Sequence, residues 1–251
     1  MSISNNLNIH PDFRPLKGRK AVFKPRSLAV MNAIVSFFSA RRVAKYKTVI
    51  SRETITGVDG NRIPLLIIRP ENLSSPSPAL VYCHGGAFVY KYAPSHIDNA
   101  VRYARDAQCV VVFVDYRLAP QHPFPAGFDD CYATLRYTHS QADNLGIDKQ
   151  RIAVGGDSAG GTMAAGVAQK AHDNSVKLCG QMLVYPGTDT DLARPSVAAF
   201  ASVPPFKALS YAAVWENYLG HPLAIQPGPY ALPMQGRLAG LAPANVETCE
   251  F

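Results

Sequence analysis

The sequence contains no long hydrophobic run, no internal repeat and no low-complexity tract. Its longest apolar stretch runs from Ser27 to Ala40, is interrupted by Asn32 and Ser36, and is too short to span a bilayer. The stretch also lacks the start-of-chain position and the small-residue cleavage site of a signal peptide. We therefore predict a helix with a broad apolar face, and no stable membrane insertion.

The chain has few cysteines, and their spacing forms no recognisable motif. The chain has five cysteines, and none of them forms a C-x-x-C pair. This spacing argues against a zinc or redox motif and favours small core residues in a reducing compartment. We therefore predict a cytoplasmic location. Since the sequence also lacks a metal-ligand cluster and a phosphate-binding loop, we predict no metal and no other cofactor. The cysteines are Cys83, Cys109, Cys131, Cys179 and Cys249.

Charged residues make up only 17% of the chain, and the net charge of +7 is unevenly distributed. Residues 1–52 hold 11 of the 25 Lys and Arg but one of the 18 Asp and Glu, which leaves 14 basic and 17 acidic residues for the remainder. A basic segment can contact an anionic surface, but this one contains no recognisable nucleic-acid-binding motif. We interpret it as the solvated face of a lid-like segment and predict no nucleic-acid partner.

The order of apolar segments predicts an α/β fold. Residues 48–57 and 63–70 read as two strands joined by a turn at residues 59–61, which favours an antiparallel hairpin. Further along, continuous apolar strands alternate with helical segments, and this alternation is typical of a parallel sheet covered by helices. The strands are expected at 78–83, 109–116, 151–156 and 179–187, and the helices at 95–107 (with Ser95 as N-cap), 128–142 and 159–172.

Three regions are expected along the chain. Residues 1–45 form an N-terminal cap segment, and residues 46–251 form the core. A proline-rich insertion at about 190–235 lies over the sheet and contains one helix near residues 209–218.

The stretch GDSAG at residues 156–160 carries the first chemical signal. It fits the G-x-S-x-G pattern, follows a predicted buried strand and opens a predicted helix, which is the setting of a nucleophile elbow. Gly156 and Gly160 would let the strand and the helix approach closely around a strained Ser158. The hydroxyl of Ser158 would then project above the carboxyl ends of the strands, where open α/β sheets bind ligands.

The stretch HGGAF at residues 84–88 immediately follows the predicted strand 78–83. Acyl transfer places negative charge on a carbonyl oxygen, and backbone N–H groups of a glycine-rich loop can stabilise that charge. Gly85 and Gly86 open the loop, and Ala87 stands where a third glycine is common but keeps its N–H. We interpret His84 as a structural residue that hydrogen-bonds the loop.

Three motifs in this order, HGGAF, YRLAPQHPFPAGFDD (116–130) and GDSAGG (156–161), resemble the hormone-sensitive-lipase family of α/β-hydrolases. The resemblance runs from about Tyr46 to Phe251. It implies the α/β-hydrolase fold, a mostly parallel, doubly wound sheet with an antiparallel N-terminal edge and a helical cap. The implied activity is that of a carboxylesterase or lipase.

The resemblance also assigns roles to individual residues. Ser158 is expected to be the nucleophile, and the amides of Gly86, Ala87 and Ala159 are expected to donate to the oxyanion. Asp157 is expected to be a structural part of the elbow rather than a catalytic acid, and YRLAP a turn that braces this face. Gln121 departs from the family, which usually has glutamate there.

The general base is not evident from the sequence. In α/β-hydrolases the triad follows the order Ser, Asp or Glu, His, and only His172 and His221 follow Ser158. His172 ends the helix that Ser158 begins, about 20 Å away at about 1.5 Å per residue. His221 lies in the insertion, and no acid follows it at the expected place.

The final stretch, LAGLAPANVETCEF, resembles the family segment that leads into the strand after the cap. In relatives an Asp-Pro-Leu-type turn with the catalytic acid follows, and a His-Gly-Phe-type loop with the histidine comes later. We therefore expect a C-terminally truncated copy that lacks the last strand and the closing helices and has an exposed sheet edge.

Three functional hypotheses follow. The first is a serine ester hydrolase that cleaves small or medium acyl esters through an acyl-serine, with weak or no activity in this chain. The second is a non-catalytic small-ligand binding protein on the same fold. The third is an active enzyme that uses His221 as its base. A small-molecule ester is the expected partner, and the sequence leaves homo-oligomerisation open.

Overall fold

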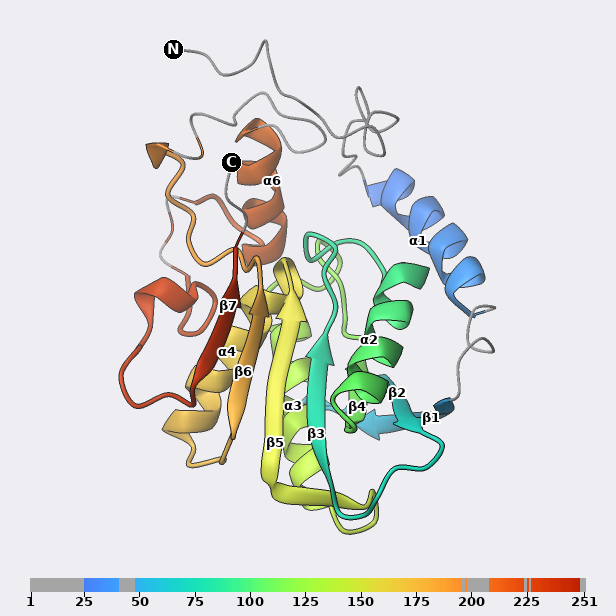
Figure 1. Cartoon of the computed structure of the whole chain (residues 1–251). Helices are drawn as coiled ribbons and strands as arrows, with labels where there is room; N and C mark the ends of the chain where they lie inside the picture. Colours follow the sequence, from blue (N-terminus) through green and yellow to red (C-terminus); the bar gives the residue numbers. More distant parts are fainter. Residues whose placement is uncertain are drawn as a thin grey trace.

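The computed structural model is built around a central β-sheet (Figure 1). The structure describes residues 25–40, 48–195, 197, 208–223, 225 and 227–248. Its strands have the order β1-β2-β4-β3-β5-β6-β7. β1 and β2 form an antiparallel hairpin and β2 is antiparallel to β4, whereas the remaining pairs are parallel. The strands are β1 (Thr48–Thr56), β2 (Arg62–Pro70), β3 (Ser77–Cys83), β4 (Val110–Val114), β5 (Ile147–Asp157), β6 (Gly180–Val184) and β7 (Ala244–Glu247).

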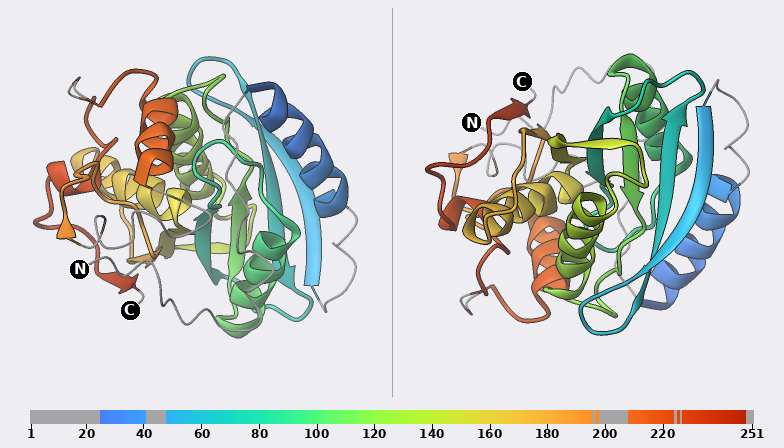
Figure 2. Two further views of the ribbon diagram at one scale, coloured as in Figure 1. Left: turned by 90° about the horizontal axis from the view of Figure 1, so that it is seen from above. Right: turned by 90° about the horizontal axis from the view of Figure 1, so that it is seen from below.

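Helices cover both faces of this sheet. α2 packs on one face and α3 and α4 on the other, while α6 lies beside the carboxyl ends of the strands (Figures 1 and 2). The predicted doubly wound α/β architecture with an antiparallel edge is therefore confirmed. The helices are α1 (Pro25–Ala40), α2 (Pro94–Asp106), α3 (Ala126–Ser140), α4 (Ala159–Asp173) and α6 (Ala208–Leu219), with a 3-10 turn at Pro233–Gln235.

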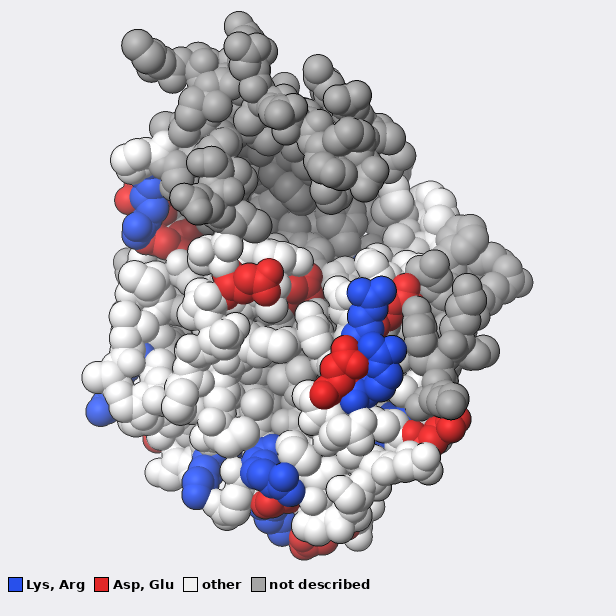
Figure 3. All heavy atoms as spheres, viewed as in Figure 1, with Lys and Arg blue, Asp and Glu red and all other residues white. Residues whose placement is uncertain are grey.

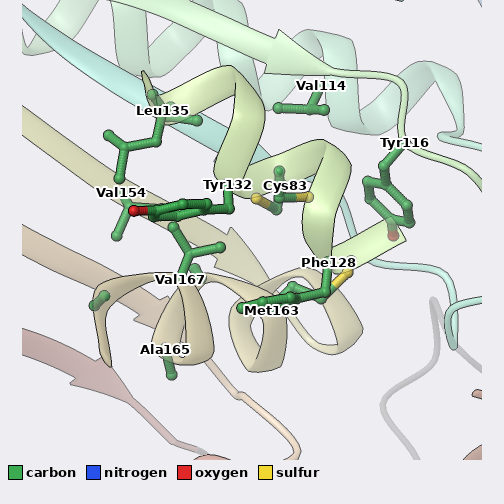
Figure 4. Close-up of a cluster of buried hydrophobic side chains, with 14 of the residues drawn as sticks. Cys83, Val114, Tyr116, Phe128, Tyr132, Leu135, Val154, Met163, Ala165 and Val167 are labelled. Carbon is green, nitrogen blue, oxygen red and sulfur yellow. The ribbon is translucent and has the colours of Figure 1, made fainter. Parts of the chain in front are cut away.

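Burial on both faces explains why the inner strands are apolar at consecutive positions. In β4, Val110, Val112 and Val114 point into the core beneath α3 and α4, whereas Val111 and Phe113 point into the core beneath α2. This alternation follows from the two-residue period of a strand. Figure 4 shows the larger core, where Tyr132 and Phe128 of α3 meet side chains of α4 such as Val167 and Met163.

The predicted start of α2 is wrong. The helix begins at Pro94, its N-cap is Ala93, and Ser95 lies inside the first turn. Proline is favoured at this position because its φ suits a helix and it has no N–H to leave unpaired. The imidazole of His96 also reaches back, and its Nδ1 accepts a hydrogen bond from the Ala93 amide at 2.8 Å. Ser95 is thus not needed as a cap.

The central pair of strands brings the two chemical motifs together. β3 and β5 run parallel, and their register pairs Cys83 with Gly156 at their carboxyl ends. The HGGAF loop leaves β3 and the GDSAG stretch closes β5, so both emerge at the same edge of the sheet. At the far side, β7 forms the edge of the described sheet, and all of its residues are exposed, including Val246 at 55%.

On the face seen in Figure 3, basic and acidic side chains of the described residues lie mostly in small mixed groups. Most of the basic segment identified in the sequence, residues 1–24 and 41–47, lies outside the described residues. Among the helices that the structure describes, none is both long enough and apolar enough to cross a membrane.

Candidate active site

Ser158 occupies a sharp bend between β5 and α4. Its backbone has φ 50° and ψ −120°, a left-handed conformation that is strained for a residue with a side chain. The bend is fixed on both sides, because the Ser158 amide donates to the carbonyl of Val184 at 2.9 Å and its carbonyl accepts from the amide of Thr162 at 3.0 Å. The side chain of Ser158 is half-buried. This is the geometry expected of a nucleophile elbow.

Two glycines allow the bend to sit against β3. A Cβ atom on Gly156 would lie 2.3 Å from the carbonyl oxygen of Cys83, and one on Gly160 would lie 2.0 Å from the same oxygen. Real Cβ atoms do not approach so closely, so each position accepts only glycine in this backbone. The close approach brings the N-terminus of α4, with the amide of Ala159, next to the loop that leaves β3.

The loop after β3, residues 84–91, is the second half of the site. Gly86 has φ 128°, and a Cβ there would lie 2.6 Å from the Tyr90 carbonyl oxygen. The Gly86 carbonyl accepts hydrogen bonds from the amides of Val89 at 3.0 Å and Tyr90 at 2.8 Å, which folds the loop into a tight turn. Ala87 and the next residue also have positive φ. We call residues 84–91 the oxyanion loop below.

The amides at this point divide into two groups. The Gly85 amide is used structurally, because it donates to Asp157 Oδ1 at 3.0 Å. The amides of Gly86, Ala87 and Ala159, in contrast, have no acceptor within the part of the chain that the structure describes. Unpaired backbone N–H groups at the carboxyl ends of β3 and β5 are suited to bind a negatively charged oxygen.

His84 is held beneath the oxyanion loop as a neutral ring. It is fully buried, its ring stacks on Tyr116 at 4.2 Å and on Phe113 at 5.8 Å, and its Nδ1 lies 2.7 Å from the Gly85 carbonyl oxygen. Burial, together with the nearby imidazole of His96, lowers the pKa of His84 to about 3. The ring therefore supports the loop and is not placed to accept a proton from Ser158.

Asp157 ties the elbow to β3 and α2. Its Oδ1 accepts hydrogen bonds from the Tyr82 hydroxyl at 2.6 Å and from the Gly85 amide, and its Oδ2 lies 3.3 Å from His96 Nε2. Burial by itself would raise the pKa of Asp157, but the hydrogen bonds from His96, Tyr82 and the Gly85 amide outweigh it and leave the pKa lowered.

The Asp157–His96 pair was missed in the sequence, where His96 carries no local motif. It has the composition of a catalytic dyad, yet both ring nitrogens are engaged: Nδ1 accepts from the Ala93 amide, and Nε2 faces Asp157. Asp157 is adjacent to Ser158 in sequence, but His96 has no ring nitrogen free to take the proton of Ser158. Its role in this structure is to fix the elbow.

The comparison with known families agrees with this arrangement. A family model described as alpha/beta hydrolase fold matches residues 80–251, which include the oxyanion loop and the elbow. The chain belongs to the alpha/beta hydrolase family. The resemblance to hormone-sensitive-lipase-type hydrolases predicted from the three motifs is thereby confirmed.

Individual relatives of this chain are named as esterases. The chain is 44% identical to the carboxylesterase NlhH of Mycobacterium tuberculosis over 154 residues, which cover 61% of this chain and 48% of the relative. It is 40% identical to the esterase LipI of the same organism over 177 residues, covering 70% and 55%. The solved structure of esterase LipW from Mycobacterium marinum matches with a TM-score of 0.84 and 32% identity, covering 95% of this chain and 76% of that one. The chain spans about half the length of the curated relatives it matches.

The YRLAP motif braces the oxyanion loop. The Tyr116 hydroxyl donates to the His84 carbonyl at 2.6 Å, and the Ala119 amide donates to the Phe88 carbonyl at 3.0 Å. Arg117 anchors the motif, since its guanidinium pairs with the buried carboxylate of Asp130 at 2.9 Å. The motif thus holds the loop from the side opposite to the elbow.

Replacement of Arg117 by lysine is expected to lower the free energy of unfolding by about 1–2 kcal/mol. The guanidinium contacts both carboxylate oxygens of Asp130 and also the Ala126 carbonyl, and a lysine ammonium cannot reproduce this fork. Urea unfolding measures the change. The matched control is Asp59→Asn, which removes the exposed partner of the same guanidinium and is expected to have a much smaller effect. Equal effects of the two substitutions would contradict the expectation.

The two histidines that follow Ser158 lie elsewhere. His172 is near the far end of α4. Its Nε2 lies against Gly240, 3.0 Å from the point that a Cβ on this glycine would occupy. His221 is at the end of α6, and it shares a surface hollow of about 460 Å³ with Lys170. Lys170 is twelve residues beyond Ser158 on α4, hence about 18 Å along the helix. No histidine in the described ranges is hydrogen-bonded to the Ser158 hydroxyl.

Helix α6 contacts the oxyanion loop directly. Phe88 stacks on Tyr218 at 3.8 Å and lies 5.4 Å from the ring of Trp215. Both α6 side chains are buried. Their packing on Phe88 means that this helix shapes the loop as well as the space above it. Within the described residues there is no group of three or more His, Cys, Asp or Glu that could hold a metal ion.

Proposed function

We propose that this chain acts on carboxylic esters of small or medium acyl groups through an acyl intermediate on Ser158. The observation that carries the proposal is the strained Ser158 between Gly156 and Gly160, beside the unpaired amides of Gly86, Ala87 and Ala159. The names of the relatives, carboxylesterase and esterase, support the same class of substrate.

In the proposed reaction, Ser158 Oγ attacks the ester carbonyl carbon and a new C–O bond forms. The carbonyl oxygen becomes negatively charged and accepts hydrogen bonds from the three amides. The bond to the alkoxy group then breaks, and the departing alcohol takes up the proton that Ser158 released. Water attacks the acyl-serine, gives the free carboxylic acid and restores the hydroxyl. The residue that carries the proton between these steps is not assigned.

Hydrolysis of p-nitrophenyl acetate and p-nitrophenyl butyrate tests the proposal. The 251-residue chain is expected to release p-nitrophenol faster than buffer, and Ser158→Ala is expected to reduce the rate to the buffer value. The absolute rate is expected to be low, because within the described residues no histidine is hydrogen-bonded to the Ser158 hydroxyl to accept its proton.

Two control variants accompany this assay. Ser51→Ala removes an exposed hydroxyl on β1 and is expected to keep the full rate. His221→Ala is also expected to keep it, since His221 lies with Lys170 rather than with Ser158. A rate in Ser158→Ala equal to that of the unsubstituted chain would refute the proposed nucleophile, and a loss in His221→Ala would favour that residue as base.

The alternative function is binding of a small carboxylate by the same three amides. The observation that favours it is that no described imidazole contacts Ser158, so the amides can hold an anion without turnover. Calorimetric titration with butyrate separates the two functions. Saturable binding that is unchanged in Ser158→Ala, in a chain without Ser158-dependent hydrolysis, would support the binding protein. The cytoplasmic location stays a prediction.

A further inference from the structure

The N-terminal helix α1 reaches the oxyanion loop through one polar side chain. The amide group of Asn32 bridges two backbone positions of the loop, because its Nδ2 donates to the Val89 carbonyl at 3.0 Å and its Oδ1 accepts from the Lys91 amide at 2.9 Å. The side chain thus pairs with the loop as a neighbouring strand would. Val89 and Lys91 are 57 and 59 positions away from Asn32 in sequence.

Among the described side chains of α1, Asn32 and one buried leucine account for most of the contact with the loop. Leu28, one turn before Asn32 on the same face, is 1% exposed and packs with Val89 and Ala119. Other apolar side chains of the helix, such as Val30 at 61% and Ile34 at 48%, are exposed. The described part of α1 is therefore docked on the loop mainly by two side chains. Figure 2 shows the helix at the edge of the molecule formed by β1 and β2.

The oxyanion loop has a strained backbone that contacts from other elements must stabilise. Ala87 and Phe88 have φ of 52° and 62°, values that residues with a Cβ atom rarely adopt. The Gly86 carbonyl closes the turn by accepting from the Val89 and Tyr90 amides, and the Phe88 carbonyl is tied to Ala119. Asn32 hydrogen-bonds to Val89 and Lys91, the two residues that flank Tyr90 where the chain leaves this turn. The strained backbone is thus fixed from both ends.

We propose that Asn32 is a positioning residue, which holds the oxyanion loop in the conformation that presents the Gly86 and Ala87 amides to the acyl oxygen. Docking of α1 would then be required for full oxyanion binding, although the helix does not contact the reacting atoms. This inference rests on the ester-hydrolase function proposed above, and it adds a residue from the N-terminal segment to the machinery of that site.

Hydrogen exchange of single amides tests the proposal without enzyme activity. In Asn32→Ala the Lys91 amide loses its acceptor, and we expect its exchange to rise about tenfold. The amides of Val89 and Tyr90 do not contact Asn32, yet we expect their exchange to rise about tenfold as well, because the turn that they close is no longer held. Ser36→Ala, an exposed change on the same helix, is expected to match the unsubstituted chain.

Kinetics give the second measurement. We expect Asn32→Ala to lower kcat for p-nitrophenyl acetate about tenfold with KM changed less than twofold, since misplaced donors weaken binding of the transition state and not of the ester. Asn32→Asp keeps the acceptor for the Lys91 amide but loses the donor to the Val89 carbonyl. Its kcat is expected to lie between that of Asn32→Ala and that of the unsubstituted chain.

The outcomes separate the two proposals. Faster exchange at Lys91 alone, or at none of the three amides, would overturn the positioning role of Asn32. An effect on KM with unchanged kcat would overturn it as well. Absence of Ser158-dependent hydrolysis in the unsubstituted chain would refute the ester-hydrolase proposal instead, and the exchange data would then decide by themselves whether Asn32 holds the loop.

Discussion

Replacement of Gly160 by alanine is expected to prevent the elbow from forming and to destabilise the chain by more than about 3 kcal/mol. The added Cβ would lie 2.0 Å from the carbonyl oxygen of Cys83 and 2.6 Å from the carbonyl carbons of Cys83 and His84. These are backbone atoms of the central strand, so they cannot move aside as a flexible side chain can. The clash therefore acts on β3, α4 and the oxyanion loop at once.

Circular dichroism and urea unfolding measure this effect. Gly180→Ala is the matched control, since a Cβ on Gly180 in β6 has only the Pro243 carbonyl oxygen within reach, at 3.6 Å, which is an ordinary contact. The control is expected to be as stable as the unsubstituted chain or slightly more stable. A Gly160→Ala chain that unfolds at the same urea concentration as the control would show that α4 does not approach β3 as described.

The second large effect is a loss of stability in mild acid that originates at His84. Burial lowers the pKa of this ring to about 3, with a further contribution from His96, while the Gly85 carbonyl and Asp157 counter only part of the shift. In the unfolded chain the pKa is about 6.5. The unfolded state therefore binds the proton first, so stability is highest above pH 6.5 and falls as the pH decreases from there toward 3.

The slope expected from His84 is about 1.4 kcal/mol for each pH unit inside that window. His84→Phe keeps an aromatic ring between Tyr116 and Phe113 but cannot bind a proton, so its free energy of unfolding is expected to fall less steeply between pH 6 and 4. It loses the hydrogen bond to Gly85, which lowers stability by about 1 kcal/mol at pH 7.

Urea unfolding at several pH values between 4 and 8 provides the test. His221→Phe makes the same replacement at a partly exposed position and serves as the matched control. An unchanged slope in His84→Phe would mean that another group dominates the acid response. Asp157 acts at lower pH, because its lowered pKa gives stability that is complete above about 3.8 and is lost below that value.

Much of the fold could be predicted because its signals are local. The β4 segment is apolar at every position since it is buried on both faces, and the turn at residues 59–61 marks the hairpin. The elbow could also be predicted, because Gly156, Ser158 and Gly160 are close in sequence and each meets a steric demand of the same bend.

The residues that were missed act over long distances in the chain. His96 reaches Asp157, and Asn32 reaches Val89, through contacts that no spacing rule encodes. Ser95 was chosen as a helix cap from its residue type, whereas Pro94 and the side chain of His96 start the helix instead. A side chain that stabilises a loop far away in the sequence has no local sequence pattern. Its role can be recognised only in the folded structure.

The parallel register of β3 and β5 has a consequence for how such a scaffold diversifies. The proposed nucleophile and its proposed amide donors are spaced by a backbone ladder that pairs Cys83 with Gly156, and not by the side chains around them. Substitutions in α6 that keep its packing on Phe88 can therefore alter the space above the site while this ladder is preserved. Selection for new substrates can act there as long as the contacts that hold the oxyanion loop are kept.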